Sequence, residues 1–161
     1  MEESARFISD IELMDVRMLH LDVSVSPIAP KDECTVTISV NFPLMSFSRA
    51  DGGSRCEENL RLVLDIKVNE NSGDEREVIS AVADVIIAVG GEFPGVDDES
   101  AEHALIADAA VTAYEFARAA IHGVTSQSPV QRFYVPSTDR EGLLAAALRN
   151  MSEQGEGAGA D

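Results

Sequence analysis

The sequence is poor in the residues that build disulfide frameworks, zinc sites and basic binding surfaces. Its two cysteines, Cys34 and Cys56, lie far apart, and this spacing fits neither a disulfide framework nor a zinc site. We therefore expect two free thiols in a reducing cytoplasm. Lys and Arg number 12 against 29 Asp and Glu, a formal net charge of −17. This charge argues against nucleic acid and anionic membranes as partners, because both are polyanions.

Long apolar runs and catalytic motifs are also missing. No run approaches the roughly 20 residues that a membrane span needs, and the acidic residues 1–10 lack the apolar core of a signal peptide. The three histidines, His20, His103 and His122, fall in separate predicted elements. No metalloprotease, serine-hydrolase or paired-cysteine motif occurs. We therefore expect a cytoplasmic protein with no membrane insertion, no metal, no cofactor and no enzymatic activity.

Alternating apolar and polar residues predict four strands, at residues 11–25, 34–44, 58–70 and 77–89. With 45% apolar residues, the chain has enough material for the core of one domain. The fourth strand is apolar on both faces, which indicates that both are buried. Asp84 is an unusual carboxylate in that strand. It is a candidate for catalysis, although such a residue more often lies at an interface or a rim.

The first two strands carry signs of irregularity. The apolar positions change parity near Arg17, which predicts a bulge there. In the second strand, Pro43 lacks an amide hydrogen and therefore predicts an edge or a bulge. The pattern puts one set of side chains of this strand on a single face: Cys34, Val36, Ile38, Val40, Phe42 and Leu44.

A long helix is predicted at residues 101–122, followed by a shorter one that ends near Met151. In the long helix Asp108, Glu115 and His122 recur every seven positions and form one narrow polar stripe, with Arg118 beside them. The rest of its circumference is apolar, which is typical of a helix buried on two sides. His122 lies at the end of the helix, where an imidazole complements the helix dipole.

The connection between the two predicted helices is apolar and aromatic, whereas an ordinary connection is polar. It contains Val130, Phe133, Tyr134 and Val135. Some other surface must cover these side chains, and that surface is the best clue to function.

The order of the elements and the last third of the chain resemble SecB, the bacterial preprotein chaperone, and its SecB-like relatives. Residues 114–118 (YEFAR) match the family's aromatic-Pro-Tyr-Ala-Arg, and residues 126–136 resemble its Arg-Gly-Thr-Phe-Pro-Gln…Ala-Pro segment. Residues 8–13 (ISDIEL) resemble the start of SecB-like proteins more than that of the export chaperone. Glu115 stands at the family's proline and Gln127 at its glycine, which favours a divergent member.

The resemblance implies an α+β fold. A four-stranded antiparallel sheet is followed by a long helix, an extended cross-over segment and a short C-terminal helix. The expected organisation is a flexible N-terminus at residues 1–10, a SecB-like chaperone domain at residues 11–151 and a disordered acidic tail at residues 152–161.

The function that the resemblance implies is that of an ATP-independent chaperone, a holdase. It would bind unfolded or aggregation-prone polypeptides in apolar grooves, for export or for a toxin–antitoxin partner. The resemblance also implies a homo-oligomer, a tetramer built as a dimer of dimers. It offers the SecA motor or an antitoxin as a partner. The competing hypotheses are an enzyme or small-ligand carrier with a pocket between sheet and last helix, and a purely structural oligomer.

Two sets of residues follow as candidates from this resemblance. The apolar candidates for binding a client are Phe42, Leu44, Phe133, Tyr134, Val135, Leu144 and Leu148. The competing interpretation of the aromatic and leucine side chains is that they only pack the last helix onto the sheet. The acidic candidates for binding a protein partner are Asp15, Asp22 and Asp84.

Overall fold

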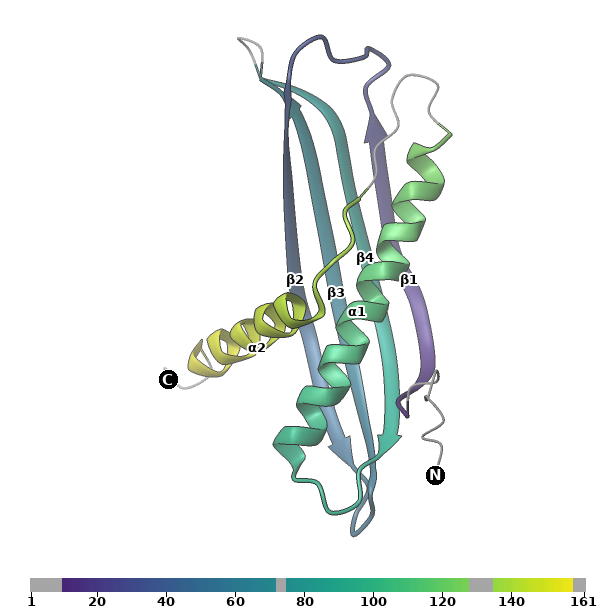
Figure 1. Cartoon of the computed structure of the whole chain (residues 1–161), viewed down its shortest axis with the longest axis vertical. Helices are drawn as coiled ribbons and strands as arrows, with labels where there is room; N and C mark the ends of the chain where they lie inside the picture. The colour runs from purple at the N-terminus through teal and green to yellow at the C-terminus, as the bar shows by residue number, and fades with distance from the viewer. Residues whose placement is uncertain (1–9, 72–74, 128–134, 158–161) are drawn as a thin grey trace, which may run out of the picture.

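The computed structural model describes residues 10–71, 75–127 and 135–157. Two helices lie on one face of a long four-stranded antiparallel sheet, and the longer helix crosses the sheet diagonally (Figure 1). The predicted fold class is therefore confirmed. In the sheet the strands follow the order β1-β4-β3-β2. The elements are β1 (Glu12–Val25), β2 (Cys34–Arg49), β3 (Arg55–Glu70), β4 (Arg76–Glu92), α1 (Asp98–Thr125) and α2 (Arg140–Gly157).

The first strand contains two irregularities where sequence predicts one. The register of β1 against β4 shifts between Leu13 and Asp15 and again between Met18 and His20. The two shifts flank Arg17, near which the parity of the apolar residues changes. Each extra residue inverts the alternation of side chains, so both are needed to keep apolar residues facing the helices.

A bulge at Pro43 corrects the prediction for β2. Asn41 pairs with Val63 and Leu44 pairs with Arg61, so the strand has an extra residue between them, at the edge of the sheet as predicted. Phe42 is buried on the face under the helices. Leu44 is 41% exposed and lies with Arg61 on the opposite face of the sheet, which the helices do not cover and which we call the open face. The prediction that Phe42 and Leu44 share one face is wrong, because the inserted residue inverts the alternation.

The core lies between α1 and the two central strands. The helix can approach the sheet closely because many of its buried residues are alanines. Eight residues on the buried side of α1 have no exposed surface: Ala101, Leu105, Ile106, Ala109, Ala110, Ala113, Ala117 and Ile121. Under them lie alternate residues of β3 and β4, from Leu60 to Ile66 and from Ile79 to Val89. On the other face of β4, Val82 and Ile86 are only half-buried in the single chain, so the prediction that both faces are buried holds for one face.

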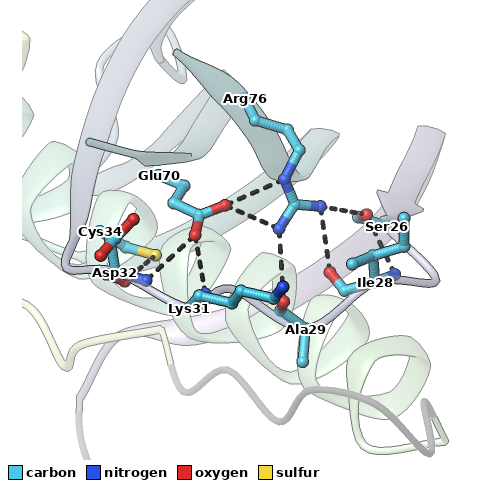
Figure 2. A network of polar contacts seen from close by, with 8 residues as sticks. All are labelled: Ser26, Ile28, Ala29, Lys31, Asp32, Cys34, Glu70 and Arg76. Atoms are coloured by element: carbon cyan, nitrogen blue, oxygen red, sulfur yellow. Dashed lines mark hydrogen bonds and ion pairs between the residues drawn. The ribbon is translucent and has the colours of Figure 1, made fainter. Parts of the chain in front are cut away.

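A polar network ties the loop after β1 to the last residue of β3 and the first residue of β4 (Figure 2). The Glu70 carboxylate accepts hydrogen bonds from the backbone amides of Lys31 (2.7 Å) and Asp32 (3.0 Å) and from the Arg76 guanidinium (2.8 and 2.9 Å). Arg76 also donates to Ser26 Oγ at 2.8 Å. The backbone amide of Lys31, then Arg76, hold the pKa of the Glu70 carboxyl below its usual range. The network therefore fixes one end of the sheet around a charged carboxylate.

The start of α1 is attached to the opposite end of the sheet. Asp97 caps the helix by accepting a hydrogen bond from the backbone amide of Ser100 at 2.8 Å. Arg49, the last residue of β2, donates to Asp98 Oδ1 and to the Val96 carbonyl, both at 2.6 Å. This arginine therefore holds the turn before the helix against the end of β2.

A buried carboxyl group lies close to this attachment. Glu58 of β3 is fully buried, and neither of its carboxyl oxygens makes a hydrogen bond in the described part of the chain. Burial, and then the charge of Glu102 near the start of α1, raise the pKa of Glu58 from 4.5 to about 8. The nearby backbone amide of Ser46 lowers this pKa by a smaller amount, although its geometry does not reach that of a hydrogen bond. Glu58 is therefore protonated at neutral pH, and its ionisation opposes the packing of α1.

The raised pKa of Glu58 predicts a loss of stability with rising pH. The unfolded chain releases this proton above pH 4.5, while the folded chain holds it up to about pH 8. The free energy of unfolding therefore falls as pH rises through this window and levels off above it. Urea unfolding at pH 5, 7 and 9 measures the effect, and Glu58→Gln removes it. Glu57→Gln, on the open face, is the matched control. An identical pH profile for wild type and Glu58→Gln would show that the proton on Glu58 does not contribute.

The last helix continues beyond its predicted end. α2 extends past Met151 to Gly157, so the prediction of a disordered tail starting at residue 152 is wrong for its first part. Two side-chain amides on α2, Asn150 Nδ2 and Gln154 Nε2, donate to the Phe42 carbonyl at 2.9 and 3.2 Å. These contacts give the last turns a partner on the edge strand, which sequence periodicity does not reveal.

Truncation of the tail tests whether the helical turns after Met151 contribute to stability. Removal of residues 152–161 deletes the Gln154 contact, and a net hydrogen bond contributes about 1 kcal/mol. In a chain of this size we expect the melting temperature to fall by about 2–4 °C. Gln154→Ala in the full chain should reproduce most of this loss, whereas Glu153→Ala should not. A truncated chain that melts at the wild-type temperature in calorimetry would contradict the structural role of these turns.

Candidate functional site

The described part of the cross-over segment, residues 135–139, lies along the polar stripe of α1. Three side chains of the helix hold two successive residues of the segment. Tyr114 Oη donates to the Pro136 carbonyl at 2.8 Å, and Arg118 Nε donates to the Val135 carbonyl at 2.6 Å. The backbone N–H of Val135 donates to His122 Nε2 at 2.6 Å. We call Tyr114, Arg118 and His122 the clamp.

The remaining polar residues of this stripe make ion pairs that support the same connection. Glu115 holds the guanidinium of Arg118 at 3.0 Å, and Asp108 lies 3.7 Å from Arg140 at the start of α2. Burial, and the neighbouring charge of Glu115, raise the pKa of the Tyr114 hydroxyl, although Arg118 opposes them. The phenol therefore remains a hydrogen-bond donor. The stripe predicted from sequence is thus the side of α1 that binds the connection to α2.

The apolar candidates divide between core and partly exposed positions. Phe42 and Val135 are buried, while Leu144 and Leu148 of α2 are half-buried against the core. Leu44 lies on the opposite face of the sheet, away from Phe42. Phe133 and Tyr134 lie outside the described residues. The structure therefore brings Phe42, Val135 and the α2 leucines to the helix side of the sheet and separates Leu44 from them.

Apolar side chains remain exposed on the helix side of both edge strands. On β2, Val36 is 45% and Ile38 is 37% exposed, although they pair with core residues of β3. On β1, Leu13 and Leu21 are exposed on the same side of the sheet. α1 adds Phe116 and Val124 on its outer side. Val36 and Ile38 are neighbours on one face of β2, and large apolar side chains that stay exposed together are typical of a surface that binds another chain.

The acidic candidates lie on the same face of the sheet, the open face opposite the helices. Asp15, Asp22 and Asp84 face away from the helices, because they pair with or belong to the outward positions of β4. Two of them are ion-paired: Asp15 with Arg17 at 2.9 Å, and Asp84 with Arg61 at 2.5 and 2.8 Å. The hydrogen bonds from Arg61 lower the pKa of Asp84. This arrangement gives Asp84 a structural partner, and the face carries mixed charge rather than acid alone.

The pocket expected between sheet and last helix exists as a cleft of about 220 Å³ between β2 and α2. It is lined by Val40, Asn41, Ala146, Arg149, Asn150 and Glu153. Sites for small organic ligands usually measure about 300–1,000 Å³. In the described ranges, no group of three or more His, Cys, Asp or Glu side chains is arranged to hold a metal ion. Neither described helix is long and apolar enough to cross a membrane.

Sequence reasoning did not identify the clamp as functional. It interpreted Glu115 and Arg118 as an exposed ion pair and His122 as a partner of the helix dipole. The available signal was the family motif at residues 114–118, whose aromatic residue and arginine are Tyr114 and Arg118. Their spacing of one helical turn places them side by side along α1.

No protein-family model matches this chain, and no curated protein matches it. Among solved structures, it is similar to the Mycobacterium tuberculosis Rv1957 SecB-like chaperone in complex with a ChAD peptide from the Rv1956 HigA1 antitoxin. The match has a TM-score of 0.51 and covers 80% of this chain and 91% of that one, with 16% sequence identity. At this identity the similarity shows the fold, and it confirms the predicted SecB-like architecture.

Proposed function

We propose that this protein is an ATP-independent chaperone that holds unfolded or aggregation-prone polypeptides on the helix side of its sheet. The observation that carries the proposal is the exposed apolar surface on that side, above all Val36 and Ile38 of β2. The peptide in the similar structure supports it, because a protein of the same fold binds a segment of another chain. An extended apolar segment of a client is the ligand that fits such a surface.

Physical considerations support a holdase. Each apolar side chain that a client buries contributes about 1.5–3 kcal/mol. Several weak contacts along one client add through multivalency, so tight binding requires little sequence selectivity. The net charge of −17 keeps a complex with exposed client segments soluble. Such binding needs no nucleotide, and release follows from mass action or from transfer to a partner.

The partners remain those that the SecB-like fold suggests. Between an exported preprotein and an antitoxin, the antitoxin peptide on the similar structure favours the second as client class. The open face of the sheet, which carries Asp22 and the ion-paired Asp15 and Asp84, is the surface for a basic protein partner such as the SecA motor. The protein works in the cytoplasm.

The aromatic residues of the cross-over segment test the proposal. We expect Phe133→Ala/Tyr134→Ala to fold and assemble normally, but to bind an unfolded client at least tenfold more weakly, because two apolar anchors are lost. The measurement is suppression of aggregation of a denatured model protein at stoichiometric amounts without ATP. Val96→Ala, an exposed apolar position in the turn before α1, is the control. Loss of folding or assembly would mean that the pair packs the structure; full protection by a folded variant would remove both residues from the site.

Self-association is a second expectation. Leu13, Leu19 and Leu21 on β1 and Phe116 on α1 are exposed in the single chain, and burial in a second copy would stabilise them. We propose a homotetramer that is a dimer of dimers. Sedimentation equilibrium at micromolar concentration should give four times the mass of the chain, and Leu19→Glu/Leu21→Glu should lower it. A stable monomer of the wild-type chain would contradict this proposal.

A further inference from the structure

The three side chains of the clamp lie in one row along α1. Tyr114, Arg118 and His122 are spaced by four residues, so their side chains lie one above the other. The cross-over segment runs past them in the opposite direction, and the two residues Val135 and Pro136 use all three side chains. The clamp therefore sets the position of the backbone just before α2.

Two side chains of the clamp, Tyr114 and Arg118, donate hydrogen bonds to the segment, and the third, His122, accepts one. A backbone N–H can only donate, so the 2.6 Å contact between Val135 N and His122 Nε2 requires that Nε2 carries no hydrogen. The neutral imidazole satisfies this requirement, whereas the imidazolium carries a hydrogen on both nitrogens. Protonation would bring two donors face to face at Val135. Tyr114 and Arg118 make bonds that do not change between pH 5 and 8, since both donate throughout this range.

The burial of Val135 makes the loss of its hydrogen-bond acceptor costly. Val135 is fully buried, so its N–H cannot turn to water while the segment stays in place. A buried donor without an acceptor is strongly unfavourable. The contact between Val135 and His122 must therefore break when the imidazole gains a proton.

Some of the charged groups around His122 favour its protonated form, and others oppose it. On α1, Arg118 lies one turn away and opposes a second positive charge, but Glu115 neutralises it. The C-terminal end of the helix favours an imidazolium. Towards α2, Asp108 and Arg140 pair with each other. Below this half of α1, the helix-facing side chains of β1 and β4 are apolar: Met18, Leu21, Val23 and Val25, and Ile79, Ala81, Ala83 and Val85. At the end of the sheet, Glu70 is paired with Arg76.

We propose that His122 is an acid-sensitive positioning residue. Its protonation releases residues 135–139 from α1 and weakens the binding of polypeptide clients on the helix side of the sheet. Mild acid protonates histidine side chains, which change charge between roughly pH 5 and 8. The client part of this inference rests on the proposed chaperone function, while the release of Val135 does not depend on it.

Hydrogen exchange of the Val135 amide tests the release directly. In the intact, ¹⁵N-labelled protein we expect its protection factor, corrected for the intrinsic pH dependence of exchange, to fall at least tenfold between pH 7.5 and 5.5. The midpoint should coincide with that of the His122 Cε1–H chemical shift. His122→Gln places a carbonyl oxygen, which accepts at every pH, near the position of Nε2 and should abolish the pH response. His103→Gln is the control and should keep the wild-type response.

A binding experiment tests the consequence for clients. The probe is a permanently unfolded polypeptide without histidine, and its dissociation constant for the wild-type protein should rise at least fivefold between pH 7.5 and 5.5. In His122→Gln the ratio of the two constants should be close to one. Constant Val135 protection in the wild type, or a fall of equal size in His122→Gln, would overturn the clamp. A wild-type affinity that is measurable but independent of pH would overturn the link to clients. No probe binding at either pH would refute the proposed function, and Val135 exchange would still decide the clamp.

Discussion

A single helix cannot cover a sheet of this size, and the other features of the molecule follow from that mismatch. The 28 residues of α1 span about 42 Å and form a rod about 10 Å wide. Four strands of 14 to 17 residues form a surface about 50 Å long and 19 Å across. The diagonal path of α1 buries the central strands and leaves corners of the edge strands uncovered (Figure 1). On the helix side of the sheet, Val36 and Ile38 of β2 and Leu13 and Leu21 of β1 remain exposed, so the apolar surface at the two edges is a geometric consequence of the fold.

The second half of the chain is organised by the one polar stripe of α1. An alanine-rich helix offers few groups that can hold another segment, and here Asp108, Tyr114, Arg118 and His122 all contact the stretch from Val135 to Arg140. α2 is then fixed by a few apolar contacts and by two side-chain amides on the Phe42 carbonyl. These polar attachments add to the packing of Leu143 and Ala147, which belong to the same core as α1 and the sheet.

Periodicity was sufficient to predict the elements of this fold, because four alternating strands and one nearly apolar helix leave few ways to bury the core. It failed where a single residue changes the outcome. The bulge at Pro43 turns Leu44 to the open face, although the alternation up to Phe42 was read correctly. The helical turns after Met151 contain no apolar period, and their contact through Gln154 is a tertiary hydrogen bond to a residue more than 100 positions away. The clamp was missed for the same reason, since the partners of Arg118 and His122 are backbone groups, which have no sequence signature.

Each end of α1 is held by a contact that depends on one protonation state of one side chain. The two side chains set opposite limits on the pH range in which both contacts form. At the N-terminal end, Glu58 must keep its proton, and Arg49 holds the preceding turn against β2. At the C-terminal end, His122 must remain without a second proton to accept from Val135. Alkaline conditions therefore act on the packing of the helix against the sheet, and acidic conditions act on the segment that the helix positions. Because Glu58 lies in the core and His122 lies on the stripe, the first limit concerns stability and the second concerns the position of the segment before α2. A folded chain that has lost the contact between Val135 and His122 is therefore the state expected on the acidic side.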